Sequence, residues 1–188
     1  KRVTKNKFVY GHIEKDGRKF AYISYPSFSV KMGDEDLKYI APFVDEAEGI
    51  VLDVRNNSGG VGTYGVAFAG HFFTETTVGG YSARKSGVGY NDFTEPNAIV
   101  VTPTATHNWA DKPTMLLTNI GVYSTTNLFA SILKNAPNVT QVGGRSGGGG
   151  GLPETYYLPN GWTLIFPSNV LYDINKQHIE NGIQPDVE

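Results

Sequence analysis

A short, almost uninterrupted apolar segment at residues 49–54 constrains the fold most strongly. It reads Gly-Ile-Val-Leu-Asp-Val, with no alternation between apolar and polar positions. Such a segment is typical of a strand buried on both faces, which occurs in parallel sheets covered by helices. A second segment of this kind, Thr-Met-Leu-Leu-Thr, stands at residues 114–118. Helical patterns alternate with these strands, so the sequence predicts an α/β fold with a mixed sheet and packed helices.

The remaining periodicities predict further elements. Residues 34–44 have acids at the front and apolar residues at helical spacing, with Pro42 expected to kink the helix or delay its start. We also expect helices over 64–73 and 124–135, strands over 20–25 and 139–142, and hairpins over 77–101 and 155–166. The prediction is one domain over residues 20–188, preceded by a lead of residues 1–19 that ends an earlier segment or forms a solvated hairpin.

Charge and composition exclude several classes of protein. Residues 1–19 carry a balance of +5, whereas the rest carries −7, giving the net charge of −2. A body this acidic makes nucleic acid an unexpected partner. Without cysteine the chain has no disulfide, no thiolate metal site and no cysteine nucleophile. No run of about 18 apolar residues is present, so no membrane-spanning segment is expected. The chain starts without Met or an apolar leader, as expected of a fragment or a mature product.

Glycine is enriched, with 23 among 188 residues, and it gathers in two places. One is the turn Asn56-Asn-Ser-Gly-Gly60, directly after the apolar strand, and the other is the run 143–151. Glycines allow a backbone to approach a ligand and to present its N–H groups, which stabilise an oxyanion. A tight strand-to-helix turn needs the same residues, so spacing alone leaves both interpretations open.

Ser124 stands where a strand and a short loop lead into the predicted helix 124–135. Serine at a helix start commonly caps the first turn. A serine there can also be a nucleophile, because the helix N-terminus favours developing negative charge. The position alone is compatible with both roles.

Five segments in order resemble the C-terminal processing peptidases, also called tail-specific proteases. They are Leu-Asp-Val-Arg-Asn-Asn-Ser-Gly-Gly at 52–60, the segment 117–129 around Ser124, Val-Gly-Gly-Arg-Ser-Gly-Gly at 142–148, and the closing stretches 158–164 and 180–186. The resemblance implies a ClpP/crotonase-like α/β fold and a serine peptidase that cleaves near protein C-termini. It implies a protein or peptide substrate, no metal and no cofactor, and a periplasmic, secreted or membrane-tethered location. The oligomeric state stays open.

The resemblance assigns roles by position. Ser124 matches the nucleophile, and the N–H of Thr125 with that of Gly59 or Gly60 matches the oxyanion hole. Most of the family uses a lysine base, and the matching position here is Gly149. Lys134 lies ten residues along the helix, about 15 Å from Ser124 by helical rise. The usual serine–lysine pair is therefore absent.

A branch similar to the tricorn core protease uses a histidine and a glutamate instead. Glu180 matches the glutamate, whereas Ser24 stands where the histidine is expected. His178 is the alternative base, because it shares a face with Glu180 if Ile179 points inward. The other histidines, at 12, 71 and 107, are expected on the surface. The sequence thus predicts a serine endopeptidase with an atypical base. The alternative is an inactive relative that binds peptides or an apolar ligand.

Overall fold

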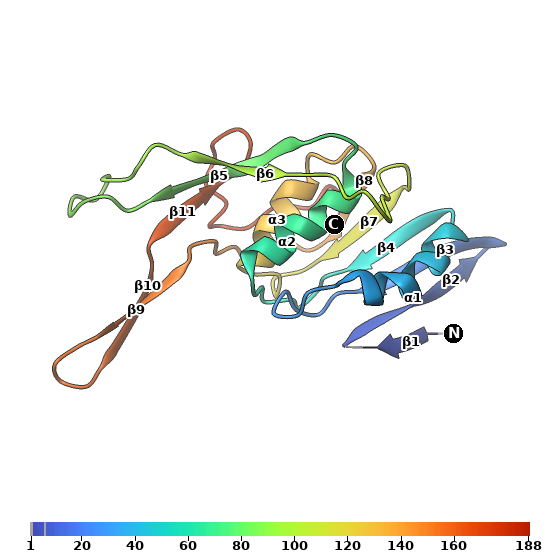
Figure 1. Ribbon diagram of the computed structural model, residues 1–188, viewed down its shortest axis with the longest axis horizontal. Coiled ribbons are helices and arrows are strands. Elements are labelled where there is room, and N and C mark those ends of the chain that lie inside the picture. The colour runs from blue at the N-terminus through green and yellow to red at the C-terminus, as the bar shows by residue number, and fades with distance from the viewer. Residues whose placement is uncertain (1, 6) are drawn as a thin grey trace.

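The computed structural model describes residues 2–5 and 7–188 (Figure 1). Its helices are α1 (Asp34–Asp45), α2 (Gly62–Ala69) and α3 (Thr125–Leu133), and a 3₁₀ turn, η1 (Gly70–Phe72), extends α2. The strands are β1 (Arg2–Lys5), β2 (Phe8–Lys15), β3 (Arg18–Ser24), β4 (Gly49–Asp53), β5 (Thr77–Arg84), β6 (Asn97–Val101), β7 (Thr114–Thr118), β8 (Val139–Gly143), β9 (Pro153–Tyr157), β10 (Thr163–Pro167) and β11 (Asn169–Tyr172). The predicted elements are all found, with ends shifted by a few residues.

The main sheet has the strand order β1-β2-β3-β4-β7-β8. The first three strands are antiparallel, and β3, β4, β7 and β8 run parallel to one another. The predicted α/β class with a mixed sheet is therefore confirmed. Because β4, β7 and β8 are parallel, their carboxyl ends meet at one edge of the sheet, where the turn after β4 and the loop before α3 lie together.

The helices cover one face of this sheet. Ile50, Leu52 and Leu116 are almost completely buried in a core shared with all three helices. On the opposite face Val51 is half-buried and Met115 is 54% exposed. The expectation that these strands are buried on both faces is wrong for Met115, because none of the described helices lies over it.

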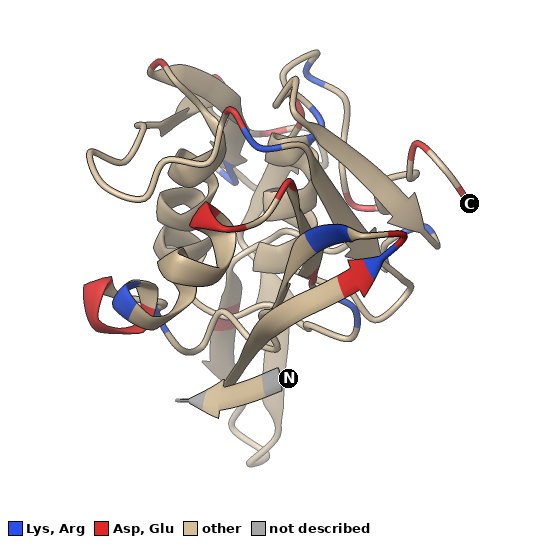
Figure 2. Cartoon of the chain, turned by 90° about the vertical axis from the view of Figure 1, so that its right-hand side faces the viewer, with Lys and Arg blue, Asp and Glu red and all other residues tan. Residues whose placement is uncertain are grey.

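A smaller sheet, β11-β5-β6, lies on the other side of α2 and α3 (Figure 1). Helices α2 and α3 pack against each other and contact β6 and β5 respectively. Neither helix contains a charged residue, and both are uniformly tan in Figure 2. Helices buried between two sheets are expected to be apolar all round, and every residue of α3 is buried.

Helix α1 begins at Asp34, so Pro42 does not delay its start. The carboxylate of Asp36 accepts a hydrogen bond from Gly33 N, and Asp36 N donates to Gly33 O, which together satisfy orphan groups of the first turn. Leu37, Ile40 and Val44 carry the buried stripe of the helix.

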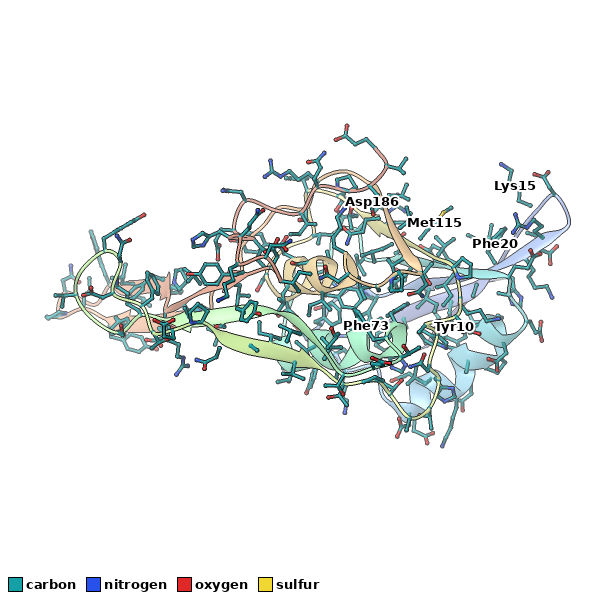
Figure 3. All side chains as sticks on the ribbon, turned by 90° about the horizontal axis from the view of Figure 1, so that it is seen from above. Tyr10, Lys15, Phe20, Phe73, Met115 and Asp186 are labelled. Carbon is teal, nitrogen blue, oxygen red and sulfur yellow. The ribbon has the colours of Figure 1, made fainter. Side chains whose placement is uncertain are left out.

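The predicted division at residue 19 falls inside the β2–β3 hairpin. Strand β2 pairs with β3 along its length, and its residues Phe8 and Tyr10 are buried in the common core. Lys15, at the turn of this hairpin, is labelled at one end of the molecule in Figure 3. The described part of the lead thus contributes to the main sheet.

Strands β9 and β10 form a two-stranded hairpin that projects from the body (Figures 1 and 3). All of their residues are exposed. Paired positions share a face, so Tyr156 and Leu164 lie on one face, and Tyr157 and Ile165 point to the other. Glu154 is the single charged residue of the two strands. No helix among the described residues is long and apolar enough to cross a membrane.

Candidate active site

Ser124 has an unusual backbone conformation at the start of α3. Its φ is +56° and its ψ is −124°, which is uncommon for a residue with a side chain. Its N–H donates to Gly148 O at 3.0 Å, and its carbonyl accepts from Leu128 N at 3.0 Å. The hydroxyl makes no capping bond to α3. The Ser124 side chain therefore does not cap the helix, and the hydroxyl is not used by α3.

The turn after β4 packs directly against Ser124. Gly59 has a φ of +104°, and a Cβ on it would stand 2.8 Å from Ser124 Cβ. Gly60 has a φ of +142°, and a Cβ there would stand 2.2 Å from Ser29 N. Both positions therefore require glycine, for conformation and for space.

Asn57 holds this turn in shape. Its side chain is fully buried, and its Oδ1 accepts bonds from Gly59 N at 2.9 Å and from the Thr126 hydroxyl at 2.6 Å. Its Nδ2 donates to Tyr25 O at 2.8 Å. One side chain thus connects the residue after β3, the glycine turn and the first turn of α3.

Two backbone N–H groups beside Ser124 make no hydrogen bond to any acceptor of the described residues. Within residues 2–5 and 7–188, no protein acceptor is found for the N–H of Gly60 or of Thr125. The Thr125 hydroxyl donates to Gly60 O at 2.8 Å, which ties the two residues together. Free N–H groups next to a serine are the kind of donors that stabilise an oxyanion.

A cavity of about 880 Å³ opens beside Ser124 between α2, the small sheet and residues 150–153. Its surface is mainly apolar, with Val66, Ile99, Leu128 and Leu171 in the wall. No charged residue and no histidine of the described chain lines it. The cavity therefore suits a neutral, apolar group.

Gly149, the position matched to the catalytic lysine, is hindered by its left-handed backbone and by the ring of Tyr123, which is 50% exposed. Its φ is +67°, and a Cβ built on it would stand 2.3 Å from Cζ of Tyr123. The neighbouring Gly150 lines the cavity. The ring of Tyr123 thus occupies the space into which a lysine would have to extend.

Glu180 lies behind the glycine wall of the cavity. Its Oε1 would be 3.3 Å from a Cβ on Gly150. Burial raises the pKa of the Glu180 carboxyl, and the charge of His178 opposes that rise. Ile179, between them in the chain, is 2% exposed, so the condition under which His178 and Glu180 share a face is met.

The structure does not bring the other predicted residues to this cavity. His178 is exposed, with its ring 4.6 Å from the ring of Tyr172. Ser24 is half-buried near the end of β3, between Ile23 and Tyr25, which point into the core, so its side chain points to the opposite face. Neither is among the described residues that line the cavity.

The expectation of surface histidines is wrong for His71. It is 5% exposed, its ring stacks on Trp109 at 4.9 Å, and its Nδ1 lies 2.7 Å from His107 O. Burial lowers the pKa of its imidazole. The helical pattern did not reveal this, because the contacts come from the loop after β6.

Sequence reasoning also missed the polar pair Asn127 and Ser146. Asn127 is fully buried in α3, three residues after Ser124, and Ser146 is 1% exposed in the glycine-rich run. The Ser146 hydroxyl donates to Asn127 Oδ1 at 2.6 Å. An asparagine within a helix that has an apolar stripe and no charged residue was the available signal.

Comparison with known proteins places this chain in a family. The sequence model described as "Peptidase family S41" matches residues 19–188. Carboxyl-terminal-processing proteases of Picosynechococcus sp. and Synechocystis sp. are each 27% identical to the chain, over 179 and 176 residues. These alignments cover 92% and 90% of this chain, but only 40% and 38% of the two proteases.

Solved structures have the same fold. A candidate peptidase from Parabacteroides merdae superposes with a TM-score of 0.92 and 38% identity, over 99% of this chain and 58% of that one. The photosystem II D1 C-terminal processing protease superposes with a TM-score of 0.70 and 18% identity, over 98% of this chain and 48% of that one. The second likeness shows the fold alone.

Proposed function

Because this chain belongs to peptidase family S41, we propose that it is a serine-type endopeptidase that hydrolyses peptide bonds by acyl transfer through Ser124. The observation that carries the proposal is the conformation of Ser124. A serine at the start of a buried helix is held at φ +56°, its hydroxyl does not cap the helix, and it adjoins an apolar cavity. Strain of this kind costs about 1–3 kcal/mol and is concentrated at functional sites.

In the proposed first step Ser124 Oγ attacks the scissile carbonyl carbon. A C–O bond forms, the C–N bond breaks, and the hydroxyl proton passes to the departing amine. Water then attacks the ester, and its proton returns to Ser124 as the acid product leaves. The N–H groups of Thr125 and of Gly60 or Gly59 are the proposed oxyanion donors. The free amides of Thr125 and Gly60 support this assignment, whereas Gly59 N already donates to Asn57.

Glu180 is the proposed partner for the proton, acting through a water or by orienting a base. Its position behind Gly150 and its raised pKa support this role, because a base whose pKa lies closer to neutrality transfers protons more effectively at neutral pH. His178 and Ser24 are weaker candidates, because His178 is exposed beside Tyr172 and the Ser24 side chain points to the face of β3 opposite the core.

The proposed substrate is the C-terminal region of a protein, with a neutral, apolar side chain in the cavity. The names of the two cyanobacterial relatives support the first part, and the uncharged cavity wall supports the second. An extracytoplasmic location is proposed on the same relationship.

A second candidate is a catalytically inactive relative that binds peptides or an apolar ligand. The observations that favour it are the glycine at position 149, which the Tyr123 ring crowds, and the lack of titratable side chains among the described residues of the cavity wall. In this second function the cavity binds a ligand, and Ser124 does not act as a nucleophile.

A fluorophosphonate probe separates the two functions. The probe forms a covalent adduct with an activated serine, which mass spectrometry detects. We expect one adduct on the wild type and on the control Ser86→Ala, which alters an exposed serine, and none on Ser124→Ala. A wild type that stays unlabelled would overturn the peptidase proposal. Enhanced fluorescence of an apolar dye on binding to the wild type, lost in Leu128→Gln, would then support the binding function.

A further inference from the structure

Two segments beside Ser124 are fastened to α3 by one buried polar cluster. Asn127 Nδ2 donates to Gly149 O at 3.2 Å and to Ile179 O at 2.9 Å. Asn127 Oδ1 accepts from the Ser146 hydroxyl, and Ser146 Oγ in turn accepts from Ile183 N at 2.6 Å. We call Asn127 and Ser146 the clasp. It joins the helix of Ser124 to the glycine-rich run and to the tail that carries Glu180.

The two fastened segments also lie against each other without room for side chains. Gly149 N donates to Glu180 O at 3.0 Å, and Ser146 N donates to Ile183 O at 3.1 Å. A Cβ on Gly148 would stand 2.0 Å from Glu180 O, and one on Gly182 would stand 2.0 Å from Ser146 O. The clasp therefore binds two segments whose backbones are already in close contact. A small displacement of the glycine-rich run would move the Glu180 backbone with it.

From this geometry we propose that Asn127 and Ser146 are positioning residues, which hold Glu180 and the wall at Gly149 in fixed register with Ser124. The catalytic part of this inference rests on the proposed peptidase function. Neither residue touches the substrate cavity, so each acts through the segments that it fastens.

The chemistry of the clasp supports positioning over simple packing. Burying an amide and a hydroxyl is costly unless their hydrogen bonds are made. Here the Asn127 amide uses both of its N–H groups, and every bond of the clasp ends on a residue within three positions of Gly149 or Glu180. Such a fully satisfied network specifies one arrangement of its segments.

The test measures the ionisation of Glu180 directly, by NMR titration of its side-chain carboxyl. The variants are Asn127→Ala and Ser146→Ala, the second removing only a hydroxyl. The matched control Asn135→Ala loses an amide that bonds only to Ser131 O and Ile132 O, near the end of the same helix. A second control, Val44→Ala, weakens the core at α1, far along the chain from the tail.

If the clasp holds Glu180 in its buried position, both clasp variants lower the Glu180 pKa toward that of an exposed glutamate, because the freed tail becomes hydrated. Both controls keep the wild-type titration. Fluorophosphonate labelling of the clasp variants at neutral pH falls by about 10- to 100-fold, the loss expected from misplacing a reacting group by about 1 Å.

Folded clasp variants with an unchanged Glu180 titration would overturn the proposal, as would an equal shift in Val44→Ala. The result is separable from the proposed function. If the wild type stays unlabelled but the Glu180 titration shifts only in the clasp variants, the peptidase proposal is overturned. The inference that the clasp positions Glu180 then still stands.

Discussion

The ring of Tyr123 lies over Gly149, where it fills the space that a side chain at that position would need. The Cβ of any substituent would stand 2.3 Å from Tyr123 Cζ and 2.6 Å from Tyr123 Oη. The residue just before the proposed nucleophile therefore hinders any side chain at the position that the resemblance matches to a lysine base.

This contact predicts coupling between the two positions. Gly149→Lys should lower the free energy of unfolding by about 2–4 kcal/mol, from left-handed backbone strain of about 1–2 kcal/mol and overlap with the ring. Adding Tyr123→Ala should restore the overlap part, giving a coupling energy of about 1–3 kcal/mol in a double-mutant cycle from urea unfolding. Additive effects would show that the ring moves aside freely. A rise in fluorophosphonate labelling of the double variant alone would show that the new lysine reaches Ser124.

Two glycines that stand two positions apart, Gly60 in the proposed oxyanion turn and Gly62 at the start of α2, should respond oppositely to alanine. In Gly60→Ala the new Cβ would lie within 2.3 Å of backbone atoms of Phe28 and Ser29, at a φ of +142°. The free energy of unfolding should therefore fall by at least about 3 kcal/mol. Gly62→Ala, at the first position of α2, meets nothing within 4 Å, and it should stabilise the protein by about 0.4–1 kcal/mol. Thermal and urea unfolding measure both. Equal effects at the two sites would contradict the geometry.

Asn57 should be among the most sensitive polar residues. Asn57→Ala removes bonds to Gly59 N, the Thr126 hydroxyl and Tyr25 O, all in the interior. Leaving these groups unpaired should cost about 2–4 kcal/mol of unfolding free energy. Asn97→Ala is the control, because Asn97 is exposed and its change should stay within about 0.5 kcal/mol. A loss below 1 kcal/mol for Asn57→Ala would mean that water replaces these bonds.

Ionised Glu180 should lower the stability of the folded protein. Folding raises the pKa of the Glu180 carboxyl, so its ionised form destabilises the folded state. This loss of stability is absent below the pKa of the unfolded state. It develops as the pH rises and is complete above the raised pKa of the folded state. Glu180→Gln should therefore raise the melting temperature at neutral pH by at most a few degrees, and leave it unchanged at pH 3. It should also reduce fluorophosphonate labelling. A stability gain that is equal at both pH values would mean that ionisation is not its cause.

The fold was largely predictable because it depends on local periodicity. Apolar runs placed β4 and β7, the stripe through Leu128 and Ile132 placed α3, and Pro159-Asn-Gly161 placed the β9–β10 hairpin. Exposure of single residues was less predictable. Met115 lies on the sheet face without helices, and His71 is covered by a loop that follows it by more than 30 residues.

The site was predictable only where one residue carries the signal. Ser124 stands at a recognisable strand–loop–helix junction, and Gly59 and Gly60 stand after a recognisable strand. The clasp joins residues 19 to 52 positions apart in the chain, and the Tyr123–Gly149 contact joins residues 26 positions apart. Such pairings arise from tertiary contacts, which no short-range pattern contains.

The β9–β10 hairpin has a consequence for the protein in solution. It offers apolar side chains on both faces, and a single carboxylate is the only charge in its strands. Natural edge strands usually carry lysines, prolines or bulges that discourage pairing with another chain. Apart from the prolines at its base, Pro153 and Pro167, this hairpin lacks such protection, so self-association and precipitation should begin there. A lysine at Ile165 is the simplest way to raise solubility without altering the cavity at Ser124.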